Sequence, residues 1–271
     1  MITILFTSCT SDDVEEPINE TDGLTMLQEF ENTEHTIEVY SKLDKFYTGY
    51  NHLSIRVKNN ADNTYFQDIS LSWMPMMVMQ TMNHSCPKSA LIKMEDKASL
   101  YSGYTIFQMT GVNGTGWSLK FTYTINGTDY VMEENINVSQ SLKQNVTTFT
   151  GNDATKYIMA IVEPMKPEIA INEYKIALHK MESMMLFPVV EDYIIKLDPR
   201  MPSMGNHSSP NNTDLIYHTS DKLYHGNLSL TMSGYWVLNH KLLNQDDIVL
   251  KGEDIVDGVL DQSSLFLEIE F

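Results

Sequence analysis

The sequence predicts an all-β protein built from two tandem immunoglobulin-like β-sandwich domains. Three features predict it: short stretches of alternating apolar and polar residues, turn-forming residues between them, and a pattern that occurs twice along the chain. Alternation with a period of two places one face of a strand against a core. Short strands at this spacing, without a helical period, are typical of a sandwich. A chain of 271 residues, 42% of them hydrophobic, is long enough to form two such domains.

The first half of the chain shows the strand pattern most clearly. Expected strands cover residues 52–58, 65–73, 104–109, 117–125 and 130–138. Residues 59–63 have turn chemistry, and Asn126-Gly127 is typical of a two-residue hairpin turn. The glycine turn at 111–116 lies between two strands and opens no helix, so it lacks the context of a phosphate-binding loop.

The second half repeats this pattern after a polar stretch, residues 140–152, that we expect to be mainly loop. Its expected strands cover residues 158–162, 173–181, 193–197, 226–232, 235–243 and 265–271. A domain boundary between residues 150 and 170 follows. We therefore assign residues 35–155 to a first sandwich and residues 156–271 to a second.

The start of the chain resembles the end of a bacterial lipoprotein signal. Residues 2–9 form an apolar run that finishes in small residues and Cys9, followed by polar and acidic residues like those of surface lipoproteins of the Bacteroidetes. The segment lacks a basic region and is too short for a whole signal. The resemblance implies a shortened signal at 1–9, lipidation of Cys9, an acidic tether at 10–34, and an outer-membrane lipoprotein of the bacterial cell envelope. If Cys9 carries lipid, Cys86 has no partner for an internal disulfide.

An internal repeat lines up the two halves. Residues 83–87 read Asn-His-Ser-Cys-Pro, and residues 206–210 read Asn-His-Ser-Ser-Pro. Each pentapeptide follows methionines and precedes Tyr-x-Gly, a strand, Met-(Ser/Thr)-Gly and a strand that opens near Trp117 or Trp236. Because both order and residue type persist, we interpret the chain as a tandem duplication.

The second copy resembles the YtkA-like domain, which is related to the FixH family. The resemblance is carried by Met201-Pro202-x-Met204-Gly205-x-His207, Pro210, Tyr224-x-Gly226 and the segment from Met232 to Trp236, and it covers about residues 190–243. It implies a small extracytoplasmic β-sandwich associated with copper handling and oxidase assembly. The first copy, about 65–125, is a diverged version with four extra residues between Pro75 and His84.

In the second copy, Met201, Met204 and His207 are the candidate ligands. Two thioethers and one imidazole suit Cu(I), and a nitrogen from His218 or His225 would also admit Cu(II). Pro202 and Gly205 would shape the loop so that the three side chains converge. The alternative is that the two methionines fill gaps in the core and His207 lies on the surface.

In the first copy the candidates are Met76, Met79, Met82, His84 and Cys86. A free thiol two residues after a histidine would strengthen a soft-metal site, whereas zinc is disfavoured because thioethers are poor zinc ligands. Two alternatives remain open here: an exposed methionine patch that binds a protein partner, and plain core packing.

Charge and motifs narrow the function further. A net charge of −18 argues against nucleic acid as a partner, and the chain has no nucleophile elbow, zinc-protease motif or P-loop. We therefore expect a non-enzymatic cell-envelope lipoprotein that binds copper, mainly Cu(I), for storage, delivery or detoxification, with a copper-receiving or transport protein as a further partner. The alternative is a structural or adhesive surface module that binds a protein or a glycan.

Overall fold

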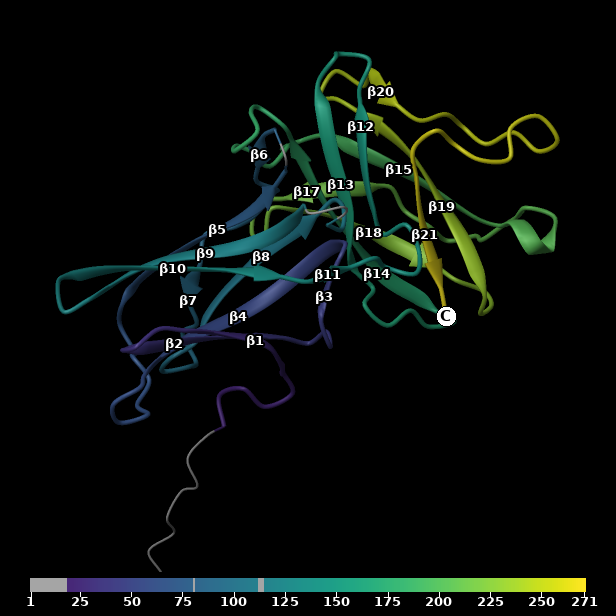
Figure 1. Cartoon of the computed structure of the whole chain (residues 1–271). Coiled ribbons are helices and arrows are strands. Elements are labelled where there is room, and N and C mark those ends of the chain that lie inside the picture. Colours follow the sequence, from purple (N-terminus) through teal and green to yellow (C-terminus); the bar gives the residue numbers. More distant parts are fainter. Residues whose placement is uncertain (1–18, 80, 112–114) are drawn as a thin grey trace, which may run out of the picture.

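The computed structural model describes residues 19–79, 81–111 and 115–271, and these residues form an all-β protein (Figure 1). The prediction of an all-β fold is confirmed. Within the described residues the only helix is the short 3-10 turn η1, Pro202–Met204. No helix in this part of the chain has the length and apolar character needed to cross a membrane.

The N-terminal unit is a sandwich of two antiparallel sheets. One sheet has the order β1-β2-β4-β8-β7 and the other the order β10-β9-β5-β6. The strands of the first sheet are β1 (Thr25–Glu31), β2 (His35–Ser41), β4 (Gly49–Asn59), β7 (Ile92–Lys93) and β8 (Tyr101–Phe107). Those of the second are β5 (Ser70–Val78), β6 (Asn83–His84), β9 (Gly116–Ile125) and β10 (Thr128–Ile136). Two short parallel strands, β3 (Phe46–Tyr47) and β11 (Val138–Ser139), lie beside them.

The C-terminal unit repeats this arrangement within one continuous ladder of ten strands. One layer runs β12 (Val146–Thr150), β13 (Lys156–Glu163), β14 (Ile171–Lys180), β18 (Leu223–Ser229) and β17 (Leu215–His218). The other contains β15 (Ile194–Met201), β16 (His207–Ser208), β19 (Tyr235–Leu243), β20 (Val249–Lys251) and β21 (Phe266–Glu270). Strand β17 pairs with both β18 and β15 and so joins the two layers.

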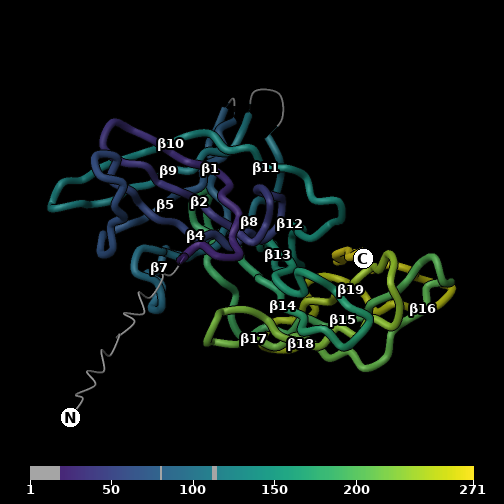
Figure 2. The backbone as a smooth tube through the Cα atoms, turned by 90° about the horizontal axis from the view of Figure 1, so that it is seen from below, coloured from purple at the N-terminus to yellow at the C-terminus, as the bar shows by residue number. Residues whose placement is uncertain are grey.

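The two units correspond strand by strand. The order β1-β2-β4-β8-β7 matches β12-β13-β14-β18-β17, and β10-β9-β5-β6 matches β21-β19-β15-β16. Each unit also has its own core of buried side chains, one around Trp117 and one around Trp236. Figure 2 shows the purple-to-blue strands gathered on one side and the green-to-yellow strands on the other. The repeat read in the sequence is therefore also a repeat of topology.

Local chemistry explains where several strands turn. Asn126 and Gly127 have φ angles of 50° and 80°, which is the left-handed backbone of a two-residue hairpin turn, and they join β9 to β10.

In β5 the residues at 71, 73, 75 and 77 are buried while those between them are more exposed, as period-two alternation requires.

Several segments differ from expectation, among them β2 at residues 35–41, where no strand was expected. Residues 25–31, which lie inside the expected tether, form β1 and pair with β2. Residues 146–150, expected to be loop, form β12 at the edge of its sheet. Strands β8 and β18 begin three residues before their expected starts because the Tyr-x-Gly segments pair within the sheet, Gly103 with Leu53 and Gly226 with Tyr174.

A small third cluster of apolar residues connects the two units. Ile106, Tyr50 and Tyr104 of the N-terminal unit pack with Ile158, Ala160, Ala177, Phe187 and Leu223 of the C-terminal unit. The Tyr104 hydroxyl donates a hydrogen bond across this junction to Nε2 of His179, at 3.3 Å. His179 Nδ1 donates to the carbonyl oxygen of Phe187 at 2.8 Å, which leaves Nε2 as the acceptor.

Candidate metal site

The methionine-rich stretch of the N-terminal unit folds into a hairpin of β5 and β6, here called the N-terminal methionine hairpin. The Met79 amide donates to the Met82 carbonyl at 3.1 Å and closes the turn. Val78 then lies opposite Asn83, and Met77 lies opposite His84. Met79 and Met82 are 37% and 49% exposed, so both thioethers are accessible at the tip.

His84 shares a sheet face with Met77, because residues opposite each other on paired strands point to the same side. Its ring meets the Trp117 indole edge to face, with centroids 5.7 Å apart. Its Nδ1 donates to the Ser85 carbonyl at 2.8 Å, which leaves Nε2 as the nitrogen with a free lone pair. A backbone carbonyl that fixes the tautomer in this way is typical of metal-binding histidines.

Met76 and Cys86 do not join this arrangement. Met76 is next to Met77 on β5, and since side chains alternate along a strand it lies on the opposite face from His84. Cys86 is 2% exposed, and its Sγ lies 3.1 Å from the Thr105 hydroxyl oxygen. Burial raises the pKa of the Cys86 thiol to about 12. The thiolate that would bind metal is therefore disfavoured in the folded protein.

The C-terminal unit contains the equivalent hairpin of β15 and β16, here called the C-terminal methionine hairpin. Met201 lies opposite His207, as Met77 lies opposite His84. The connection passes through η1 and then Gly205 and Asn206, whose φ angles of 65° and 59° turn the chain back. Met204 is 56% exposed and His207 is exposed, whereas Met201 is 2% exposed.

The pairing pattern corrects the alignment of the two hairpins. Pro75 pairs with Leu119 and Pro199 pairs with Leu238, and these leucines occupy matching places after Trp117 and Trp236. Pro75 therefore corresponds to Pro199 and not to Pro202. On this alignment the first hairpin is one residue longer than the second, not four, and Met77 becomes the counterpart of Met201.

Each hairpin lies beside a tryptophan that is held by a methionine carbonyl. Trp117 Nε1 donates to the Met109 carbonyl at 2.8 Å, and Trp236 Nε1 donates to the Met232 carbonyl at 3.0 Å. Gly234, two residues after Met232, lies close to Met201. A Cβ added at Gly234 would be 3.3 Å from the Cε atom of Met201. Met109 itself is 44% exposed, so its thioether is open to solvent.

His218 and His225 lie away from this hairpin. Strand β17, which carries His218, pairs with the start of β15 at Ile194, whereas His207 pairs with its end at Met201. Seven residues of strand separate these points, a distance of about 20 Å. The two rings instead stack on each other at 4.1 Å, and His225 Nε2 lies 2.8 Å from an Asp221 oxygen. They therefore belong to a separate cluster and not to the set with His207.

One methionine-bearing loop adjoins the first hairpin and was not anticipated. The Ser85 amide donates to the Met184 carbonyl at 2.8 Å, across the two units. Met184 and Met185 are 43% and 45% exposed. The sequence Met181-Glu-Ser-Met-Met was a signal for this, but nothing in its local pattern indicated which surface it would meet.

The donor sets that remain accessible are thioether and imidazole. They comprise Met79, Met82 and His84 in one hairpin and Met204 and His207 in the other. Among the described residues, no group of three or more His, Cys, Asp or Glu side chains is placed to hold a metal. A metal at either hairpin would thus depend on sulfur ligands, which suit Cu(I). Cys9 lies outside the described residues.

No family model matches this chain, and no curated protein matches it significantly.

Proposed function

We propose that this protein binds Cu(I) at its two methionine hairpins. The observation that carries the proposal is their duplication: each unit sets a methionine opposite a histidine beside a tryptophan, next to a turn with an exposed methionine. His84 Nε2 with Met79 and Met82 would form one site, and His207 with Met204 the other. Met77 and Met201 are buried, and each closes the sandwich beneath its site.

The proposal extends to the domain type, the family and the cellular location. We propose that both units are immunoglobulin-like, which is supported by the four-strand order β2-β4-β8-β7 facing β10-β9-β5 and by its repeat in the second unit. The motif from Met201 to Trp236 supports membership of the YtkA-like group. Lipidation at Cys9 would anchor the protein in a bacterial cell envelope, where it would store copper or pass it to a receiving or transport protein without catalysing a reaction.

Anaerobic Cu(I) titration against a competing chelator tests the copper proposal. We expect wild type to bind two ions with sub-micromolar affinity. Met79→Leu/Met82→Leu/His84→Gln should lose one ion and Met204→Leu/His207→Gln the other, because leucine keeps the apolar volume and removes the sulfur.

Met26→Leu/Met165→Leu is the matched control, since both residues are 48% exposed and lie outside the two hairpins, on β1 and in the β13–β14 connection. This variant should bind two ions. Wild-type binding weaker than about micromolar, or equal binding by all variants, would refute the proposal.

A second candidate is a non-catalytic surface module that binds a protein or a glycan. It is favoured by the burial of Met77, Met201 and Cys86, which removes three sulfurs from the possible ligands. Exposed Met79, Met82, Met184 and Met185 would then act as apolar contacts. Met79→Leu/Met82→Leu, without the histidine substitution, separates the two functions, because it should weaken copper binding yet retain a partner that needs only apolar surface.

A further inference from the structure

A pocket of about 460 Å³ lies at the end of the N-terminal unit remote from the methionine hairpin. Three turns enclose it: β1 to β2, β4 to β5, and the β9–β10 hairpin. Ile125 in its wall and Trp117 beside His84 lie at opposite ends of β9. The pocket is therefore independent of the copper proposal.

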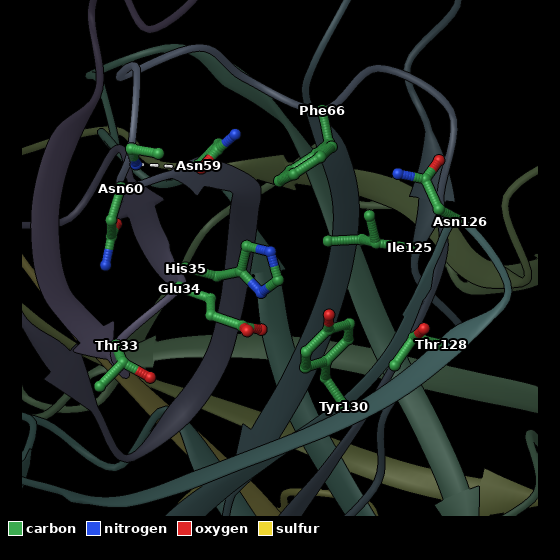
Figure 3. Close-up of a pocket in the computed structure, with 11 residues that line it drawn as sticks. Thr33, Glu34, His35, Asn59, Asn60, Phe66, Ile125, Asn126, Thr128 and Tyr130 are labelled. Atoms are coloured by element: carbon green, nitrogen blue, oxygen red, sulfur yellow. Dashed lines mark hydrogen bonds between the residues drawn. The ribbon is translucent and has the colours of Figure 1, made fainter.

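Aromatic rings form its inner wall (Figure 3). The His35 ring lies between Phe66 and Tyr130, with centroid distances of 5.3 Å and 4.7 Å and edge-to-face geometry. Behind it, Tyr123 stacks on Tyr130 at 5.3 Å. Rings that brace one another in this way present stable apolar faces.

His35 is held firmly by one nitrogen only. Its Nδ1 lies 3.2 Å from the Tyr123 hydroxyl, which also accepts from Asn32 Nδ2 at 3.3 Å. Its Nε2 makes no hydrogen bond to any described residue and, unlike Nδ1 of His240, is not sealed away from solvent. In Figure 3 the ring lies in the middle of the pocket, with the Glu34 carboxylate and the Tyr130 hydroxyl nearby. Nε2 is therefore available to a hydroxyl of a ligand in the pocket.

The rim carries neutral polar groups that the fold does not use. Asn126 makes no side-chain hydrogen bond within the described structure and is exposed at the hairpin turn. Asn59 uses its Oδ1 for the Ala61 amide, which leaves its Nδ2 free. Asn60, in contrast, is fully committed to Thr36 and the Asn32 carbonyl. Thr33 and Thr128 add hydroxyls.

The charges around the pocket disfavour an anionic ligand. Glu34 is the one carboxylate among the residues that line the described pocket, and these residues include no lysine or arginine. The whole chain carries a net charge of −18. An anionic ligand would be repelled with no cation to offset the repulsion.

We propose that this pocket binds a neutral pyranose, such as the terminal sugar of a glycan. One face of a pyranose ring is apolar and packs on an aromatic ring, while its hydroxyls both donate and accept hydrogen bonds. Phe66 and Tyr130 supply the apolar contact. His35 Nε2, the Glu34 carboxylate and the amides of Asn59 and Asn126 supply the polar partners. A volume of about 460 Å³ lies within the range of small-ligand sites and accommodates one or two sugar rings.

Isothermal titration calorimetry and saturation-transfer NMR with methyl glycosides test this. The panel contains glucose, galactose, mannose, N-acetylglucosamine and N-acetylgalactosamine, with sialic acid as the anionic comparison. We expect at least one neutral glycoside to bind the full chain with a Kd of about 1 mM or tighter, and sialic acid to bind at least ten-fold more weakly.

Two variants remove the recognition groups and preserve the fold. Phe66→Leu keeps an apolar side chain without a ring, and Asn126→Gly keeps a residue suited to the positive φ of the turn. Each should weaken binding about ten-fold or more in a chain that remains folded. Val131→Ala is the matched control, because Val131 follows Tyr130 on β10 and its side chain is 59% exposed.

The proposal is overturned if no neutral glycoside binds at about 10 mM, which corresponds to a binding free energy weaker than about −3 kcal/mol. Equal affinity in Phe66→Leu, Asn126→Gly and wild type would also overturn it. So would a preference for sialic acid.

Discussion

Cys86 shows how position decides the chemistry of a residue. Its thiol, two residues after His84 in the sequence, is a side chain that suits a soft metal. The counterpart of Cys86 in the other unit is Ser209. Both residues are buried, at 2% and 7% exposure. Both therefore serve to close the base of a hairpin, and Cys86 behaves as a small apolar side chain.

Burial should make Cys86 unreactive in the folded protein. In a Cys9→Ser background, in which Cys86 is the remaining thiol, we expect labelling by a thiol reagent at pH 8 to be at least 100-fold slower than for a free cysteine, because the thiol pKa is raised to about 12. Absorbance of the released thiolate reports the rate. Addition of Val78→Cys, at a 43% exposed position, should restore fast labelling of one thiol. Rapid labelling of native Cys86 would contradict its placement.

At the scale of the element, the Tyr-x-Gly segments show why the two copies kept the same residues. The Tyr101 hydroxyl accepts from the Ile69 amide and donates to the Gln67 carbonyl. The Tyr224 hydroxyl accepts from the Tyr193 amide and donates to the Val190 carbonyl. In each unit this side chain ties the chain just ahead of the strand that carries the methionine hairpin. The repeat therefore preserves the anchoring of the hairpin.

The glycines of these segments are required for close packing. A Cβ at Gly103 would lie 3.0 Å from the Ala90 carbonyl oxygen, and one at Gly226 would lie 2.9 Å from that of Thr213. Gly103→Ala and Gly226→Ala should each lower the free energy of unfolding by about 1–3 kcal/mol, as overpacking does. Urea denaturation measures this.

Gly116→Ala provides the matched control, because nothing lies within 4 Å of its Cβ position on β9. Alanine there should be neutral or slightly stabilising, since it reduces the entropy of the unfolded chain. Equal losses at all three glycines would show that propensity, and not close packing, sets the effect.

For the whole molecule, the junction between the units determines how the two hairpins are placed. The apolar cluster around Ile106 and Ala177 and the bond from Tyr104 to His179 hold the units together. The loop at Met184 then reaches the base of the first hairpin through the Ser85 amide. A loop of the C-terminal unit thus contacts the base of the N-terminal methionine hairpin.

The same junction should make stability depend on pH. Burial lowers the pKa of His179 to about 4, although bonds to backbone carbonyls oppose this. In the unfolded chain the histidine pKa is near 6.5, so between pH 4 and pH 6.5 the unfolded state binds more protons than the folded state. The free energy of unfolding is therefore undiminished above pH 6.5 and falls as the pH drops toward 4. At pH 5 the loss due to His179 should be about 2 kcal/mol.

Urea denaturation of wild type and His179→Gln at pH 7.5 and pH 5 measures this contribution. His240, whose pKa burial lowers to about 3, and the acidic surface affect both proteins alike. The decrease between the two pH values should be about 2 kcal/mol smaller in the variant. Identical decreases would show that His179 is not buried in its neutral form.

What the sequence determined by itself is the all-β class, most of the longer strands and the duplication, because alternation and turn chemistry are local properties. The expected strands at 52–58, 117–125 and 235–243 lie within or coincide with β4, β9 and β19. Strand β12 was not expected, because a short polar edge strand has no local signal apart from its partner.

Tertiary structure decided which sulfurs remain accessible. Neighbours in the sequence such as Met76 and Met77 lie on opposite faces of one strand, and Met201 and Cys86 fill the interior. It also brought His35, Phe66 and Tyr130 together from three separate turns. Such proximity depends on strand pairing over long sequence separations, which no local pattern contains.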